Sequence, residues 1–232
     1  MPSKKDKFGL CIPSEIFKKQ IKLLIKEGYK IVPINRLLKS NGKNIISITF
    51  DDGYKDNYKI FPFLKKLGIP VTIFISTNYV GKKIKYPSDI NEKNPWLRNH
   101  LNWHEIKKMI ASGFIEIGSH GLYDTNLTKE NSENLEKHIK LSKKIIEQKL
   151  KKSVNGFSYP HGKFNQKIKQ LVKKAGYSYG CTTIYGDNKN IKDKFELRRI
   201  GIYSTDNKLF KFKKKLKGAY NFVSFIERLR GA

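Results

Sequence analysis

Residues 45–75, with the sequence IISITFDDGYKDNYKIFPFLKKLGIPVTIFI, join two short apolar runs through a helical stretch. The runs IISITF (45–50) and VTIFI (71–75) are rich in β-branched residues, which is typical of strands buried on both faces. Between them, residues 54–67 place apolar side chains at helical spacing and end at Gly68, which predicts a helix. A strand, a helix and a second strand of this kind predict a parallel sheet covered by helices.

The same alternation extends outward in both directions along the chain. We expect helices over residues 14–27, 103–111, 129–150, 165–175 and 207–230, further strands over 114–118, 154–158, 177–184 and 198–203, and a loop or excursion over 81–102. There are enough strand and helix units to close a β/α barrel, or one that lacks a single strand, and an open doubly wound sheet is the alternative. No internal repeat or long linker interrupts the pattern, so residues 1–232 are expected to form a single domain.

The composition limits the partners that this chain is expected to have. It contains 48 basic and 20 acidic residues, which gives a formal net charge of +28, and 42 of the basic residues are lysine. Sequence-specific nucleic-acid recognition favours arginine, whose planar guanidinium makes two-pronged contacts, so no specific nucleic acid is expected as a partner. A general attraction to anionic polymers or membrane surfaces is compatible with the charge.

Targeting and redox features are sparse. The N-terminal residues are basic but lack the apolar stretch of a secretory signal, and no window reaches the length of a transmembrane segment. The two cysteines, Cys11 and Cys181, are far apart and do not predict a disulfide scaffold. We therefore expect a protein without a transmembrane segment, located in the cytoplasm.

Polar residues follow three of the expected strands at their carboxyl ends. Asp51 and Asp52 follow 45–50, His120 and Asp124 follow 114–118, and the turn Tyr159-Pro160-His161 follows 154–158. In a parallel barrel these ends share one rim, and catalytic residues gather there. The pattern therefore predicts an active site at the carboxyl-terminal rim.

The Asp51-Asp52 pair allows two interpretations. Adjacent residues in an extended segment point in opposite directions, so one carboxylate is suited to bind a metal and the other to activate water. Alone, such a pair is more often the N-terminal cap of the following helix. The expected presence of His120 and Asp124 on the same rim, at a spacing compatible with metal ligation, favours a site. A Ser119-His120-Asp124 nucleophile triad is disfavoured, because the serine is not on a G-x-S-x-G turn.

Three segments together resemble the polysaccharide deacetylase family (carbohydrate esterase family 4). They are SITFDDGY (47–54), EIGSHGLYDTNLT (116–128) and FSYPHGKFN (157–165), and the similarity extends over most of residues 14–203, including LRRI (197–200), with 204–232 as a C-terminal helical segment. The resemblance implies a distorted (β/α) barrel and the removal of acetyl groups from N-acetylated sugars with one divalent metal ion. It implies Asp51 as general base, Asp52, His120 and Asp124 as metal ligands, and the His161 backbone N–H as an oxyanion contact.

The chain departs from the family pattern at three places. Asp124 stands where a histidine is usual. The ligands would then be two carboxylates and one imidazole, whose charges cancel that of a divalent ion. Zinc is the metal expected from the family, and manganese, iron, cobalt or nickel are alternatives. Ser158 and His161 stand where arginine and tyrosine are frequent. No Leu-x-His motif is present near the C-terminus to supply the general acid, so His161 is the candidate, ahead of His104.

These observations predict a metal-dependent hydrolase that removes N-acetyl, or O-acetyl, groups from a carbohydrate such as an N-acetylhexosamine-containing glycan or glycolipid. The alternative is a catalytically impaired barrel that binds glycan without turnover. Tyr54, Tyr159 and Pro160 are the expected substrate contacts, and Tyr123 and Trp103 are further aromatic candidates for stacking on sugar. His100 and His138 are expected to be surface residues.

Overall fold

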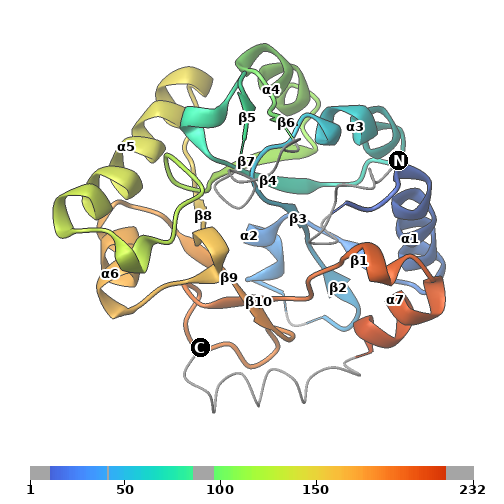
Figure 1. Ribbon diagram of the computed structural model, residues 1–232. Coiled ribbons are helices and arrows are strands. Elements are labelled where there is room, and N and C mark those ends of the chain that lie inside the picture. The colour runs from blue at the N-terminus through green and yellow to red at the C-terminus, as the bar shows by residue number, and fades with distance from the viewer. Residues whose placement is uncertain (1–10, 41, 86–96, 218–232) are drawn as a thin grey trace.

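The computed structural model describes residues 11–40, 42–85 and 97–217. Its central feature is a sheet of six parallel strands that curls into a half-barrel, with helices around the outside (Figure 1). Along the sheet the strands follow the order β10, β9, β8, β7, β4, β3. Their bounds are β3 (Ile48–Phe50), β4 (Val71–Ile75), β7 (Ile115–Ser119), β8 (Gly156–Ser158), β9 (Tyr179–Tyr185) and β10 (Leu197–Arg199). The predicted α/β barrel is confirmed, with six strands in the main sheet where the sequence predicts about seven.

The middle of the sheet is buried on both faces, as the apolar run 71–75 predicts, whereas residues 45–50, expected to be buried as well, are only partly buried. All five residues of β4 are buried, and their side chains alternate between two cores. Phe74 packs with Tyr179 and Leu197 inside the curl, whereas Ile73 and Ile75 belong to the larger core beneath the helices. This double burial is the reason that the strand reads as a continuous apolar run rather than an alternating one.

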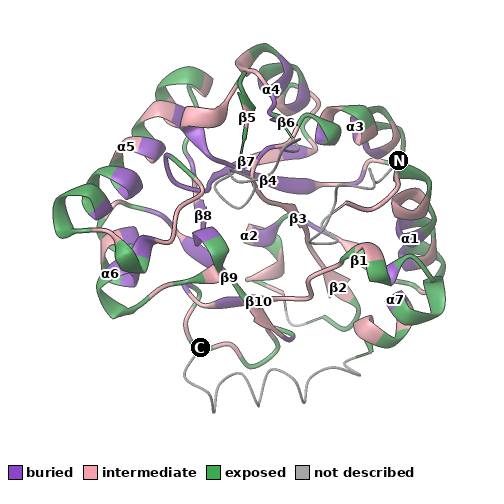
Figure 2. Cartoon of the chain, viewed as in Figure 1, coloured by how far each residue is buried: buried purple, intermediate pink, exposed green. Residues whose placement is uncertain are grey.

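The helices that flank the sheet have exposed outer faces and buried inner faces (Figure 2). They are α1 (Ser14–Lys26), α3 (Asp56–Lys66), α4 (Trp103–Ile110), α5 (Ser132–Leu150), α6 (Gln166–Lys174) and α7 (Leu209–Leu216). Asparagine side chains cap three of them: Asn102, Asn131 and Asn165 each accept a backbone N–H of the first turn. Within the described residues, no helix has the length and apolar composition needed to cross a membrane.

Smaller elements complete the half-barrel. The strands β1 (Lys30–Ile31) and β2 (Ile45–Ile46) form a parallel pair, and β5 (Lys83–Ile84) and β6 (Arg98–Asn99) form an antiparallel pair. Between β1 and β2, α2 (Ile34–Leu37) places Ile34 in the core inside the curl. The 3-10 turns are η1 (Thr77–Tyr79), η3 (Leu127–Lys129), η4 (Pro160–Gly162) and η5 (Ser204–Asp206).

Element boundaries differ from the expectation in several places. The predicted excursion over 81–102 contains the β5–β6 pair, with residues 86–96 outside the described residues. The helix predicted from residue 129 begins at Ser132, because Asn131 caps it. The last strand ends at Arg199 rather than 203, where its pairing register with β9 shifts. Of the helix predicted over 207–230, residues 209–216 are helical, and 218–230 lie outside the described residues.

Candidate active site

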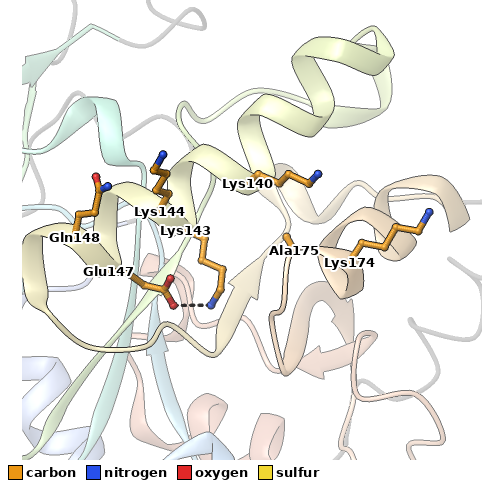
Figure 3. A pocket seen from close by; sticks show the side chains of 7 residues that line it. All are labelled: Lys140, Lys143, Lys144, Glu147, Gln148, Lys174 and Ala175. Carbon is orange, nitrogen blue, oxygen red and sulfur yellow. Dashed lines mark ion pairs between the residues drawn. The ribbon is translucent and has the colours of Figure 1, made fainter.

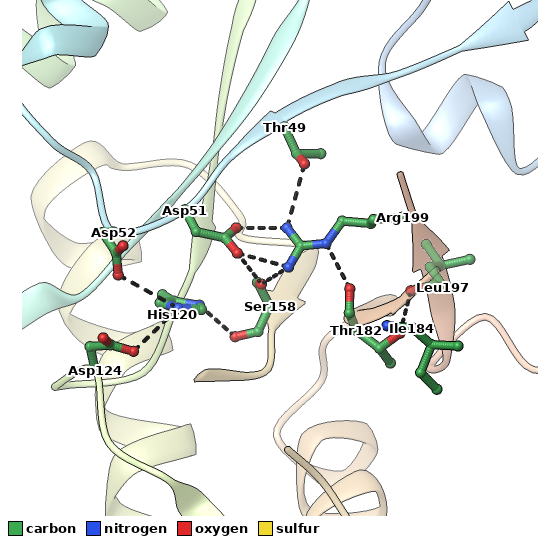
Figure 4. A network of polar contacts seen from close by, with 10 residues as sticks. All are labelled: Thr49, Asp51, Asp52, His120, Asp124, Ser158, Thr182, Ile184, Leu197 and Arg199. Atoms are coloured by element: carbon green, nitrogen blue, oxygen red, sulfur yellow. Dashed lines mark hydrogen bonds and ion pairs between the residues drawn. The ribbon is translucent and has the colours of Figure 1, made fainter. Parts of the chain in front are cut away.

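The residues predicted to form a site converge at the carboxyl-terminal edge of the sheet. Asp51 and Asp52 follow β3, His120 and Asp124 follow β7, and Ser158 ends β8 (Figure 4). Arg199 reaches the same cluster from the end of β10. Four segments that are distant in the sequence therefore contribute side chains to one site, as the parallel topology requires.

Asp52, His120 and Asp124 form a compact group of metal-ligand type. One ligand atom from each of the three residues lies within 4.8 Å of the others. The Nε2 atom of His120 is 3.7 Å from Oδ1 of Asp52 and 3.7 Å from Oδ1 of Asp124. Ligands of a tetrahedral zinc ion are about 3.4 Å apart when each lies about 2.1 Å from the ion. The spacing between the three side chains is therefore suited to a divalent cation.

The orientation of the His120 imidazole is set by a hydrogen bond to Ser158. Its Nδ1 atom is 2.8 Å from the backbone oxygen of Ser158. A carbonyl oxygen can only accept a hydrogen bond, so Nδ1 carries the proton and Nε2 presents its lone pair to the two carboxylates. The His120 backbone N–H also donates to the oxygen of Ile75. A buried imidazole held in one tautomer by a carbonyl is a common arrangement for a metal ligand.

The raised pKa of Asp52 shows that its negative charge is not balanced within the Asp52–His120–Asp124 group. Burial raises the pKa of Asp52 to about 6; the carboxylates of Asp124 and Asp51 contribute to this rise, whereas His120 and the Tyr54 side chain oppose it. Its Oδ1 atom is buried and has no hydrogen-bond partner. A bound cation would satisfy this oxygen and offset the repulsion between carboxylates, so the residues present fit a metal ion.

The turn at Asp52 and Gly53 places the first ligand. Both residues have left-handed backbone conformations, with φ of 66° and 71°. A Cβ atom at residue 53 would lie 2.7 Å from Cγ2 of Ile75, so only glycine fits there. This turn directs Asp51 and Asp52 to different partners, and the division of roles between the two carboxylates stays a prediction.

Asp51 is held by Arg199 rather than by the metal group. The guanidinium makes two parallel contacts with the carboxylate, 2.8 Å from Nη1 to Oδ1 and 2.7 Å from Nη2 to Oδ2. The Ser158 hydroxyl donates to Oδ2 of Asp51 at 3.3 Å. Burial alone would raise the pKa of Asp51, but the charge of Arg199, together with the hydrogen bonds from Arg199 and Ser158, lowers it to about 2. Asp51 is therefore ionised and fixed in direction.

Arg199 is the functional residue that sequence reasoning missed, because it entered only as part of the LRRI similarity. Its Nε atom donates to the backbone oxygen of Thr182 at 2.7 Å, and Nη1 is 3.5 Å from the Thr49 hydroxyl. The strands β3 and β10 are the two ends of the main sheet, so this side chain crosses the opening of the half-barrel. Because the strand expected over 198–203 places Arg199 near its amino end, the signal that selected Asp51 did not identify Arg199.

His161 lies at the edge of the metal group. It adopts a left-handed conformation with φ of 55°, its side chain is half exposed, and its Nε2 atom is 3.5 Å from Oδ1 of Asp124. His104, the other predicted source of a proton, is exposed on α4. Of the two histidines, His161 is thus the one placed beside the candidate ligands.

Two of the three expected substrate contacts are corrected by the structure. Tyr159 is completely buried and its hydroxyl donates to the backbone oxygen of Phe195, and Pro160 is also buried. Both residues support the turn that carries His161 and offer no surface to a sugar. Tyr54 is partly buried, and its hydrogen bond to Asp52 gives it a role in orienting that carboxylate.

A row of aromatic rings flanks the site. Tyr54 and Tyr79 both contact His100, and Tyr123 contacts Tyr79 and His138. His100 and His138 are buried, so their predicted place on the surface is wrong; both are enclosed by these rings. Tyr123, in contrast, is 44% exposed beside Asp124, and its contact with sugar stays a prediction.

The local contacts account for two further residues considered in the sequence, Ser119 and Trp103. Ser119 is buried, donates to the Ser142 hydroxyl and accepts from the Gly121 N–H, so it is not placed as a nucleophile beside His120. Trp103 begins α4 and packs against the main core, which accounts for its aromatic side chain without a sugar.

Fold and site define this chain as a parallel β/α half-barrel with a candidate cation site at its carboxyl-terminal rim. A family model described as polysaccharide deacetylase matches residues 39–180. The poly-beta-1,6-N-acetyl-D-glucosamine N-deacetylase of Staphylococcus aureus (strain MRSA252) is 30% identical over 192 residues, which cover 77% of this chain and 63% of the relative. The chain therefore belongs to the polysaccharide deacetylase family, which confirms the resemblance noted in its motifs.

Other relatives agree with this assignment. YxkH of Bacillus subtilis (strain 168) is 29% identical over 201 residues, 84% of this chain and 66% of its own length. The crystal structure of BC0361, a polysaccharide deacetylase from Bacillus cereus, superposes with a TM-score of 0.71 at 26% identity, covering 87% of this chain and 61% of that one. The chain thus spans somewhat less than two thirds of the length of the relatives it matches.

Proposed function

We propose that this protein is a metal-dependent hydrolase that removes acetyl groups from the nitrogen of N-acetylhexosamine units in a carbohydrate. The observation that carries the proposal is the placement of an ionised carboxylate, Asp51, next to the Asp52–His120–Asp124 group. The similarity to a relative named for deacetylation of N-acetyl-D-glucosamine supports the substrate class. The same chemistry on an O-acetyl ester is an alternative substrate for the same residues.

Asp52, His120 and Asp124 are the residues that would hold the ion. When bound, a divalent cation polarises the amide carbonyl and makes water more acidic. The His120–Ser158 hydrogen bond and the Asp52–Tyr54 contact keep two of the three ligands in place before any ion arrives. Because two of the donors are carboxylates, manganese or iron(II) is as well suited to the site as zinc.

Asp51 is proposed to accept the proton of the attacking water. Arg199 keeps the Asp51 carboxylate ionised and fixes its direction, and both properties would suit a general base. A carboxylate with so low a pKa is a weak base, so it needs water that has been made acidic. This need is the physical reason that the base and the candidate metal ligands occur together in one site.

His161 is proposed to assist departure of the amine. Its imidazole is half exposed at the opening of the site, on the same side as Asp124. A proton held there would be available to the amine nitrogen as the C–N bond breaks. The His161 backbone N–H is a candidate donor to the oxyanion, as the family resemblance implies.

The test is acetate release from a panel of N-acetylated glycans after the protein is freed of metal and reloaded with zinc, manganese, iron(II), cobalt or nickel. Release with one of these ions, and none without, is the expected result. Glycan binding with no release for any ion would favour the alternative, an impaired barrel that binds carbohydrate; the cancelled charge at an Asp-His-Asp site is the observation behind that alternative. The cytoplasmic location stays a prediction, which cell fractionation would test.

A further inference from the structure

The helices concentrate positive charge at one end of the molecule. The helices α3, α4, α5 and α6 each lie between two strands of the main sheet and return from the carboxyl edge of one to the amino edge of the next, so their carboxyl ends gather opposite the candidate active site. Lysines occupy the last turn of α1, α3, α4, α5 and α6. The first turns of α1, α3, α4 and α5 instead carry acidic residues. The two ends of the half-barrel therefore differ in charge.

Part of the end of the molecule where the helices terminate carries lysines that form no ion pair within the described residues. We define the basic face as six of the exposed lysines at the ends of α3, α4 and α5: Lys65, Lys66, Lys107, Lys149, Lys151 and Lys152. Among the described residues, none of the six forms an ion pair, whereas Lys173 at the end of α6 is paired with Asp193. Positive charge on the basic face is thus not neutralised by neighbouring carboxylates.

A hollow at the centre of the basic face is also lined mainly by lysines. It has a volume of about 420 Å³ between the ends of α4 and α5, and four lysines line it with Ile110, Ala111 and Leu150. A second hollow, of about 350 Å³, continues along α5 toward α6 (Figure 3). Its only acidic side chain, Glu147, is paired with Lys143 at 2.8 Å. Lysines and partly buried apolar groups therefore alternate along this surface.

Helix stabilisation explains only part of the pattern. Lysine in a last turn interacts favourably with the negative end of the helix dipole, which accounts for Lys65, Lys66, Lys107 and Lys149 one helix at a time. Lys151 and Lys152 lie beyond the last helical residue of α5 and line the same hollow as Lys107 and Lys149. An anionic partner would account for like charges gathered at this place.

We propose that the basic face binds the surface of an anionic lipid bilayer. The charges are spread over three helix ends rather than focused on one deep pocket, and half-buried Ile110 and Leu150 lie among them. Such a mixture suits a layer of negatively charged headgroups, to which each nearby lysine adds binding energy. A nucleic acid is disfavoured as the partner, because the face has no arginine, and the large aromatic side chains exposed in the described residues, Tyr123, Tyr203 and Phe210, belong to other elements.

Docking in this orientation has a consequence for the site at the other end. The candidate ligands follow the carboxyl ends of the strands, so they would face away from the bilayer. A glycan extending from the surface, or passing above it, would then meet the open rim. The inference concerns attachment only and does not depend on the reaction proposed above.

The test compares two variants that lose the same charge. In the first, Lys107, Lys149, Lys151 and Lys152 are replaced by glutamine; in the control, exposed Lys22, Lys39, Lys82 and Lys129 are replaced. Co-sedimentation with vesicles of phosphatidylcholine alone, or mixed with phosphatidylglycerol, measures binding of the full chain. We expect wild type and control to bind the mixed vesicles and to be released by salt, and the first variant to bind about tenfold more weakly or less.

Three outcomes would overturn the proposal. Equal losses in both variants would show that net charge, not the basic face, attracts the bilayer. Undiminished binding by the first variant would show that the face is not used. If the first variant lost binding to single-stranded DNA but not to vesicles, the face would serve a linear polyanion instead. Circular dichroism during urea unfolding verifies that each variant is folded.

Discussion

At the scale of single residues, the adjacent carboxylates of Asp51 and Asp52 illustrate how neighbours acquire different chemistry. Asp51 faces a guanidinium, and Asp52 faces an imidazole and a second carboxylate. The pKa of Asp51 is lowered to about 2, and burial raises that of Asp52 to about 6. The environment, and not the residue type, thus separates the pKa values of the two carboxylates, and the proposed roles of base for Asp51 and ligand for Asp52 follow from their different partners.

Replacement of Asp51 by asparagine separates these roles. The variant is expected to bind metal as wild type does and to release acetate at least about a hundredfold more slowly, since a general base contributes about that much or more. Asp56→Asn, an exposed aspartate at the start of α3, is the matched control and should be fully active. Metal content and initial rates measure both. Equal rates for wild type and Asp51→Asn would remove Asp51 as the base.

Asp124 offers a second prediction at this scale. Replacing it with histidine adds an imidazole in place of a carboxylate, and imidazole is the more favourable donor for zinc. Asp124→His should therefore bind zinc more tightly relative to manganese, as measured by competition with a chromogenic chelator. A lower zinc affinity would place residue 124 outside the coordination shell.

The site could be predicted from the sequence where position in the chain determines position in space. Asp52, His120 and Asp124 were selected because they follow strands, and parallel strands end at a common edge. The same reasoning wrongly predicted a substrate contact for Tyr159. This residue also follows a strand, but its ring turns inward and its hydroxyl donates to the backbone oxygen of Phe195. Which way a side chain turns at the end of a strand depends on packing that residue order does not encode.

At the scale of elements, the opening of the half-barrel is closed by side chains. The strands β3 and β10 are at opposite ends of the sheet, and Arg199 of β10 reaches Asp51 just beyond β3. Contacts of Arg199 with Thr182 and Thr49 fix it between the two edges. One ion pair therefore links the two edges of the sheet and fixes the direction of the Asp51 carboxylate.

Arg199→Met tests this dual role. Loss of one partner from a largely buried pair leaves the other charge unpaired, so the free energy of unfolding should fall by about 3 kcal/mol, measured by urea denaturation. Arg198→Met, on the neighbouring residue of β10, should change it much less. In the double variant Asp51→Asn/Arg199→Met, stability should recover in part. Additive losses in the double variant would show that the two side chains do not depend on each other.

The buried inner face of α5 makes stability depend on pH. His138 is buried on this face, its Nδ1 atom has no hydrogen-bond partner, and burial lowers its pKa below the ordinary value of 6.5. Glu130 opposes this shift, and Lys137 adds to it. The unfolded chain therefore binds a proton more readily than the folded protein as pH falls through 6.5.

The contribution of His138 to stability should accordingly be greatest above pH 6.5 and be lost as the pH falls through its lowered pKa. His138→Gln, which cannot be protonated, should show a smaller decrease in the free energy of unfolding over this interval. His100, also buried, remains in both proteins, so the comparison isolates His138. Identical pH profiles for the two proteins would contradict the prediction.

Element types proved more predictable than element ends. The strands and helices of the main sheet follow from apolar runs and 3.6-residue periodicity, whereas the start of α5 depends on Asn131 and the end of β10 on a register shift. The β5–β6 pair was missed because its strands are two residues long and too short for any periodicity. A contact between residues distant in the sequence, such as that of Arg199 with Thr49 of β3, leaves no pattern in the sequence around either residue.

At the scale of the whole molecule, the candidate ligands connect regions that are distant in the chain. Asp52 lies after β3, and His120 and Asp124 lie after β7, with β4 between these strands in the sheet. An ion held by all three residues exists only when the sheet is assembled. Binding should therefore stabilise the folded protein and add nothing to the unfolded chain.

This linkage makes metal binding measurable without substrate. An ion at about one hundred times its Kd adds about 2.7 kcal/mol to the free energy of unfolding. For a chain of this size, that gain raises the Tm by about 5–10 °C relative to protein treated with chelator. His120→Ala should lose the increase, because it removes the imidazole between the two carboxylates, whereas His104→Ala, an exposed histidine on α4, should keep it. An equal increase in wild type and His120→Ala would locate the stabilising ion elsewhere, and the absence of any increase with zinc, manganese or iron(II) would show that the three side chains do not hold a cation.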